Sequence, residues 1–222
     1  MKLDFHYDAE LLSKAYRALG KLHDLWASAE SFYLKDAYLR KYHDIAHALE
    51  VTSNVVLLSD ELKASTVLAA LWHDAIYFPG AGSDANERCS AAALQNTYDF
   101  GVKLGTLEGG LGQALAVSEA ATLIRSTSIE YHLSANRLDG ELAILLDADL
   151  GALALPYDKF LAKQRAVIEE NGGTFEKHKQ QSSAFLQQFL KVRPAIYHTD
   201  KARELWEDSA RKNILRYLDE TS

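Results

Sequence analysis

The chain has little of three features that mark large classes of proteins. It has one cysteine in 222 residues, so an intramolecular disulfide is impossible, and we expect a reducing compartment. Cys89 itself is expected to be a small buried residue on a helix. No stretch approaches the roughly 18 apolar residues of a membrane span, and charges interrupt the first thirty residues. We therefore expect a cytoplasmic protein with no membrane partner.

Basic clusters and prolines are equally scarce. The 24 lysines and arginines are scattered among 31 acidic residues, which gives a net charge of −7. Because no dense basic tract could neutralise a phosphate backbone, long nucleic acid is not an expected partner. Three prolines, Pro79, Pro156 and Pro194, separate stretches rich in helix-forming residues. The predicted fold class is all-α, and the absence of a long linker predicts one domain over residues 1 to 222.

Apolar residues recur at spacings of three and four along most of the chain, as in amphipathic helices. The predicted helices cover approximately residues 9 to 30, 43 to 58, 61 to 77, 84 to 104, 115 to 126, 139 to 150, 159 to 170, 175 to 192 and 200 to 219. The sequence FPGAGS after the third predicted helix favours a loop, and Ser83 or Asp84 could cap the next helix. Because the third predicted helix is apolar on every side, we expect it to lie in the core.

Histidines and a carboxylate occur within two of these segments. His43 and His47 are four residues apart, which would place both on one face of the second predicted helix. His73 and Asp74 lie in the apolar run LAALWHDAIY. A carboxylate in such a run loses hydration at a cost in free energy unless it is paired or binds a metal.

A third apolar segment, LAILLDADLGAL, carries Asp147 and Asp149. Helix capping or surface exposure would explain either carboxylate alone. Three separate apolar helices that each carry histidine or aspartate are better explained by one shared metal site. Imidazole nitrogens and carboxylate oxygens together suit a divalent first-row metal.

The order of a His, a His-Asp doublet and a distant Asp resembles the HD-domain superfamily of metal-dependent phosphohydrolases. The family builds its site on a helical bundle, so the resemblance implies a metal-site core at approximately residues 40 to 150, with C-terminal helices at 158 to 219 packed on it. In this family the metal-binding aspartate precedes a leucine. The resemblance therefore favours Asp149 over Asp147 as the ligand. The metal ligands implied by the resemblance are His47, His73, Asp74 and Asp149.

The stretch YHDIAHALEV is also similar to YHNxxHAxDV in the cyclic nucleotide phosphodiesterases. In that stretch the second histidine binds metal and the first acts as a general acid. The similarity implies that His43 protonates the leaving-group oxygen. The alternative for His43 is a hydrogen bond that only orients a metal ligand.

Motifs along nearly the whole chain resemble a bacterial subgroup of predicted HD phosphohydrolases. The subgroup shows RxYHxxxH, FHDxxYxP, DNEExSA, LLDADLxxLG and RPxIYxT, and this chain has RKYHDIAH, WHDAIYFP, DANERCSA, LLDADL and RPAIYHT. Two departures occur. Ala85 interrupts the acidic stretch, and the subgroup's Thr-Lys-x-His is replaced by Ser-Thr-Ser followed later by His132. Arg125 or Arg88 could replace the missing basic contact, although either could equally be a solvated surface arginine.

We therefore expect a phosphohydrolase that cleaves a phosphate ester of a nucleotide or small phosphorylated metabolite with metal-activated water. The metal could be Mn, Fe, Mg, Zn, Ni or Co, and two histidines favour a transition metal over Mg²⁺. The expected catalytic residues are His43, Asp74 and Glu87. Glu87 could orient water, or it could serve only as an acid in the first turn of its helix. One ion is expected, with Glu87 and His132 as candidate ligands for a second.

Two other functions are compatible with the same residues. One is a di-iron oxygenase of HD type, which would need further histidine ligands and redox-active iron. The other is a catalytically silent helical module that binds a nucleotide. A homo-oligomer is also compatible with the sequence, because some helices are apolar on more than one face.

Overall fold

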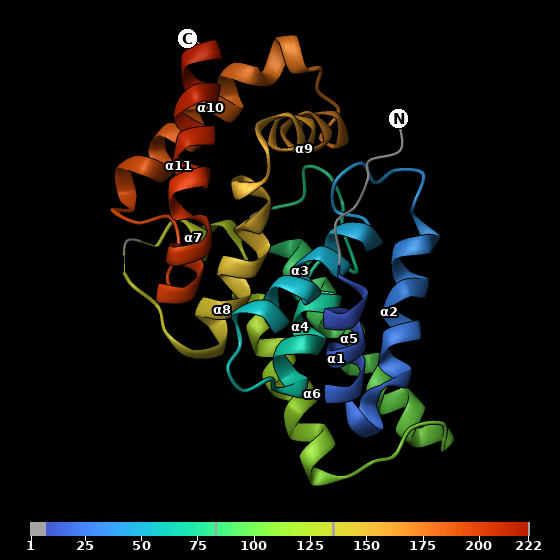
Figure 1. The fold of residues 1–222 in the computed structure, drawn as a ribbon. Helices are drawn as coiled ribbons and strands as arrows, with labels where there is room; N and C mark the ends of the chain where they lie inside the picture. The colour runs from blue at the N-terminus through green and yellow to red at the C-terminus, as the bar shows by residue number, and fades with distance from the viewer. Residues whose placement is uncertain (1–7, 83, 135, 222) are drawn as a thin grey trace.

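The computed structural model describes residues 8 to 82, 84 to 134 and 136 to 221, and all regular elements in those ranges are helices (Figure 1). The predicted all-α fold class is confirmed. The α-helices are α1 (Ala9–Ala18), α2 (Asp24–Lys35), α3 (Ile45–Leu58), α4 (Ala64–Trp72), α5 (Ala85–Leu104), α6 (Leu111–Arg125), α7 (Ile129–His132), α8 (Gly140–Asp149), α9 (Tyr157–Glu170), α10 (Phe175–Val192) and α11 (Asp200–Thr221). Two 3₁₀ turns, η1 (Gly20–Leu22) and η2 (Leu150–Ala154), complete the set.

Helices α3 and α4 form the centre of the bundle. All residues of α4 from Ser65 to Trp72 are buried, as expected for a helix without a polar face. Helix α3 packs against α4, and α1, α2, α5, α6 and α8 surround the pair (Figure 1). The two central helices therefore hold their polar side chains in a buried environment.

The C-terminal helices form a second group beside this centre. Helices α9 and α11 pack on η2, and α10 packs on both of them (Figure 1). Buried apolar side chains from Ala15 in α1 to Tyr217 in α11 belong to one continuous cluster. No helix in the described ranges combines the length and apolar character needed to cross a membrane.

The prediction of one continuous helix over residues 9 to 30 is wrong, because this segment forms two helices. Helix α1 ends at Ala18, and the 3₁₀ turn η1 separates it from α2. Gly20 has a φ of +52°, a left-handed conformation that ends a right-handed helix and that glycine adopts without steric cost.

The expectation that Cys89 is buried is also wrong, since its side chain on α5 is exposed.

The second predicted helix starts two residues later than expected. Asp44 is the N-cap of α3, and its Oδ1 accepts the backbone N–H of His47 at 3.0 Å. His43 therefore precedes the helix, and the prediction that His43 and His47 share one helix face is wrong.

At the start of α5 the N-cap is Asp84, one of the two predicted caps, and it makes no side-chain capping bond. Ser83, the other predicted cap, lies outside the described residues.

Candidate metal centre

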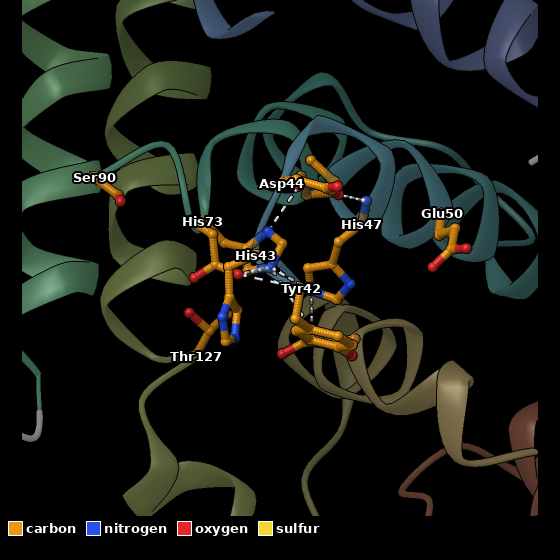
Figure 2. A network of polar contacts seen from close by, with 12 residues as sticks. Tyr42, His43, Asp44, His47, Glu50, His73, Ser90 and Thr127 are labelled. Carbon is orange, nitrogen blue, oxygen red and sulfur yellow. Dashed lines mark hydrogen bonds and ion pairs between the residues drawn. The ribbon is translucent and has the colours of Figure 1, made fainter. Parts of the chain in front are cut away.

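Three of the predicted ligands meet at the centre of the bundle. His47 comes from the first turn of α3, His73 directly follows α4, and Asp149 ends α8. One ligand atom from each lies within 4.8 Å of the others. Nε2 of His47 is 3.0 Å from Oδ1 of Asp149 and 3.3 Å from Nε2 of His73. Figure 2 shows the two histidines, one from α3 and one from the segment that follows α4, close to His43 and Tyr42.

Asp74, the fourth predicted ligand, lies against the same group. Its Oδ2 is 2.9 Å from Nε2 of His73 and 3.7 Å from Nε2 of His47. Nδ1 of His73 is 2.9 Å from the carbonyl oxygen of Ala70. A carbonyl can only accept, so Nδ1 carries a proton, and the neutral ring, once the second proton has left Nε2, directs the Nε2 lone pair toward the cluster. This tautomer is the one that a metal ligand needs.

In the absence of a metal, the two carboxylates stabilise the protonated form of His73. Burial alone would lower the pKa of His73, but Asp74 and Asp149 raise it to about 9. Despite burial, which acts to raise them, the pKa values of Asp74 and Asp149 lie below the ordinary range because of the surrounding histidines. A divalent cation would replace the proton, since metal ligands must be deprotonated.

Arg40 fixes the two segments that carry the ligands. It is buried, and its Nη1 donates to the carbonyl oxygens of His43 at 2.6 Å and Asp74 at 2.7 Å. Its Nη2 donates to the carbonyl oxygen of Ala75 at 2.9 Å. The guanidinium also lies over the ring of Tyr33, 4.9 Å from its centroid. One side chain therefore joins the segment before α3 to the segment after α4.

His43 lies beside the metal cluster and is held from two sides. Its ring stacks on Tyr77 with centroids 4.0 Å apart, and it meets the ring of His47 edge-on at 5.8 Å. Nδ1 of His43 pairs with Oε2 of Glu170, the last residue of α9. Burial would lower the pKa of His43, but Asp74 and Glu170 raise it overall.

Glu170 was not predicted as a site residue. Its side chain is fully buried, and its Oε1 accepts the backbone N–H groups of Lys41, Tyr42 and His43 at 3.0, 3.3 and 3.2 Å. In the sequence it is one acid at the end of a predicted helix, 127 positions from its partner His43. Nothing in the local sequence indicates this contact.

The structure separates the two candidate aspartates of α8. Oδ1 and Oδ2 of Asp147 each accept a backbone N–H, from His198 and Thr199, at 2.7 Å. Asp147 therefore fixes the segment before α11. Asp149 lies beside His47 and His73, as the resemblance to the HD-domain family predicted. The second oxygen of Asp149 is 3.1 Å from Nε2 of His132, the last residue of the unpredicted helix α7.

Glu87 and the two candidate arginines, Arg88 and Arg125, differ in their burial. Glu87 is half-buried on α5; burial raises its pKa, and Asp74 adds to this effect. Its predicted catalytic role stays a prediction. Arg88 and Arg125 are both exposed, and their guanidinium groups donate to nearby residues, Asp84 and Thr122. A substrate contact of either arginine stays a prediction.

A cavity of about 560 Å³ adjoins the cluster, between α7, η2, α9 and α10. Small-molecule sites in proteins have volumes of roughly 300–1,000 Å³. His43, His132 and Asp149 line one end of the cavity. The rest of its wall is mostly apolar and includes Ile129, Leu150, Leu153, Val167, Ile168, Phe185, Leu186 and Phe189.

Comparison with models of known protein families and with curated proteins finds no match to this chain. The likeness to HD-domain phosphohydrolases therefore remains a prediction. It depends on the motifs in the sequence, and the geometry of His47, His73, Asp74 and Asp149 is compatible with it.

Proposed function

We propose that the protein is a metal-dependent phosphohydrolase of HD type, a phosphomonoesterase or phosphodiesterase, which cleaves a phosphate ester of a nucleotide or small phosphorylated metabolite. The observation that carries this proposal is the convergence of His47, His73 and Asp149 within 4.8 Å, beside Asp74. A buried set of two imidazoles and two carboxylates has few purely structural uses, because each charged group loses hydration there.

The residues fit a divalent first-row metal. His47, His73, Asp74 and Asp149 would hold the ion, and the His73 tautomer set by Ala70 supports binding through Nε2. Nitrogen donors favour Mn, Fe, Co, Ni or Zn over Mg²⁺. A bound ion supplies a Lewis acid for a phosphoryl oxygen and makes water more acidic. His132, whose Nε2 meets Asp149, would keep that carboxylate in position.

His43 is the proposed general acid. Because its Nδ1 faces the carboxylate of Glu170, its Nε2 is the nitrogen left to meet a substrate. The raised pKa keeps more of the imidazole protonated near neutral pH, which a proton donor requires. A positioned imidazole of this kind contributes on the order of 10²–10⁴ to a rate. Stacking on Tyr77 fixes the plane of the ring.

The experiment is a screen of metal-stripped protein for release of inorganic phosphate. Nucleotides, sugar phosphates and 4-nitrophenyl phosphate would be tested with and without Mn²⁺, using wild type and Asp74→Ala. We expect Mn²⁺-dependent release that Asp74→Ala reduces on the order of a thousandfold or more. If Asp74→Ala kept the wild-type activity, Asp74 and the proposed metal site would not be needed for hydrolysis, and the proposal would be wrong.

Two further measurements separate the rival functions. Two irons per chain together with dioxygen uptake in the presence of a substrate would replace the hydrolase by an oxygenase. Metal-dependent nucleotide binding without any product would indicate a silent binding module. Both measurements use the same purified protein as the phosphate assay.

A further inference from the structure

The cavity beside Asp149 has two chemically different ends. His43, His132 and Asp149 form a polar end next to the proposed metal ligands. The wall from α9 and α10 carries a group of apolar residues, Val167, Ile168, Phe185, Leu186 and Phe189, together with the polar Lys163, Gln164, His178 and Ser182. A molecule that fills the cavity would therefore present one charged group and one apolar group.

Two large apolar side chains on this wall are only partly covered. Ile129 is 41 % exposed and Phe185 is 37 % exposed, although both line the cavity. Behind Phe185 lies the buried ring of Phe189, with centroids 6.2 Å apart and planes inclined by 27°. Flat apolar surface of this kind is covered well by an aromatic ring, which gains from both burial and ring contact.

The charges around the cavity do not favour a polyphosphate. Among the described residues that line it, Lys163 is the only lysine or arginine, and its Nζ is 2.7 Å from Oε2 of Glu50. This pairing offsets the charge of Lys163. A diphosphate or triphosphate chain would bring further negative charges toward the apolar wall, where they would lose hydration.

Uncharged hydrogen-bonding groups are present instead. Gln164, Asn171 and Ser182 line the cavity, and Oε1 of Gln164 accepts from the hydroxyl of Ser182 at 3.2 Å. Amides and hydroxyls offer donors and acceptors without net charge, which matches the edge of a nucleobase.

We propose that this cavity binds the leaving alcohol of the substrate and that this alcohol carries a planar aromatic group, as in a nucleoside monophosphate. The inference rests on the proposed hydrolase function. His43 lines the polar end of the cavity, with its ring against that of the proposed ligand His47, so the ester oxygen would lie beside it. A water oxygen bonds to phosphorus, the bond from phosphorus to the ester oxygen breaks, and that oxygen takes a proton from His43. The attacking water gives up one proton, which returns through solvent to His43, and the products are the free alcohol and inorganic phosphate.

The test compares ring-bearing and ring-free esters in Phe185→Ala. Adenosine 5′-monophosphate and glycerol 3-phosphate would be assayed with Mn²⁺, with Phe100→Ala on α5 as the matched control. Phe100 is 62 % exposed and does not line this cavity. We expect Phe185→Ala to lower kcat/KM for the nucleotide on the order of tenfold, mainly through KM, because loss of a base-stacking ring has effects of this size. Glycerol 3-phosphate should be hydrolysed slowly and equally by all three proteins.

Adenosine binding, measured by calorimetry without metal, separates this inference from the proposed function. Phe185-dependent adenosine binding without hydrolysis of any ester would support the cavity assignment and contradict the hydrolase. Hydrolysis that is equally efficient for glycerol 3-phosphate and the nucleotide would overturn the cavity assignment and leave the hydrolase intact. Equal turnover of adenosine triphosphate and monophosphate would also overturn it. Efficient turnover of 2-naphthyl phosphate would support recognition of the ring alone, and a preference for the nucleotide would support recognition of the base as well.

Discussion

Nδ1 of His43 is bound to the carboxylate of Glu170, which lies 127 positions later in the chain. The same carboxylate accepts three backbone N–H groups from residues 41 to 43 through its other oxygen. Glu170 therefore shapes the segment before α3 and fixes the direction of the His43 ring. Glu170 is the residue of α9 that bonds directly to His43.

Replacement of Glu170 by glutamine should weaken His43 as an acid. The amide cannot offer a charged partner, so the pKa of His43 should fall and the basic limb of the rate profile should move to lower pH. We expect kcat to drop about 10- to 100-fold, as for other partners that orient a site residue. The measurement is phosphate release as a function of pH. Glu169→Gln, at the exposed neighbouring position, is the control. An unchanged profile in Glu170→Gln would show that this contact is structural only.

Metal affinity should increase with pH up to the pKa of His73. In the metal-free protein that pKa is about 9, because Asp74 and Asp149 outweigh the effect of burial. Below pH 9 the imidazole is protonated, and the ion must displace the proton. Apparent affinity for Mn²⁺ should therefore fall about tenfold for each unit of pH below this value. Calorimetry in buffers with different ionisation enthalpies would measure both the affinity and the proton released. Affinity that is constant from pH 6 to 9 would contradict this protonation state.

Arg40→Lys should destabilise the fold and weaken the metal site. A lysine ammonium cannot reproduce the planar donors that reach the carbonyls of His43, Asp74 and Ala75. We expect a loss of about 2–4 kcal/mol in the free energy of unfolding, because buried carbonyls lose charged donors. Urea unfolding of the metal-free protein provides the measurement. Arg88→Lys, at an exposed arginine, should change it little.

His198 should make the protein less stable in mild acid. Burial and nearby Arg193 lower its pKa to about 4, and Nδ1 accepts the backbone N–H of Leu138 at 3.1 Å. The unfolded chain, with a histidine pKa of about 6.5, takes up the proton first. This contribution to stability is complete above pH 6.5 and is lost as the pH falls toward 4. His198→Asn keeps an acceptor for Leu138 and should show a smaller difference in unfolding free energy between pH 7 and pH 5. Identical pH dependence in both proteins would rule out this role.

The metal ligands could be predicted because the amino-acid sequence on either side of each one is apolar. Asp74 follows one apolar helix and Asp149 ends another, at positions where a carboxylate needs a partner, and the order of His and Asp residues places them in one motif. The helix boundaries were partly readable as well. Asp44 and Gly20 are recognisable as a cap and a break, although the apolar periodicity around them favoured longer helices.

Contacts between distant segments could not be predicted. The three carbonyls bound by Arg40 and the pairing of Glu170 with His43 depend on how helices pack, and periodicity describes only one helix at a time. The cavity has the same origin, since the residues that line it come from the segment before α3 and from α7, α8, η2, α9 and α10. Tertiary packing therefore decides the surroundings of the ligands, while the local sequence decides which residues can be ligands.

The most direct test of the central claim measures bound Mn²⁺ and phosphate release in one titration of metal-stripped protein. Activity on the best substrate should rise in proportion to bound Mn²⁺ and reach its maximum at one ion per chain. Asp44→Asn, which retains a helix cap beside the site, should behave as wild type. Asp149→Asn should lose both the bound ion and the activity. Phosphate release without bound metal, or full activity in Asp149→Asn, would contradict the claim that this cluster is a catalytic metal centre.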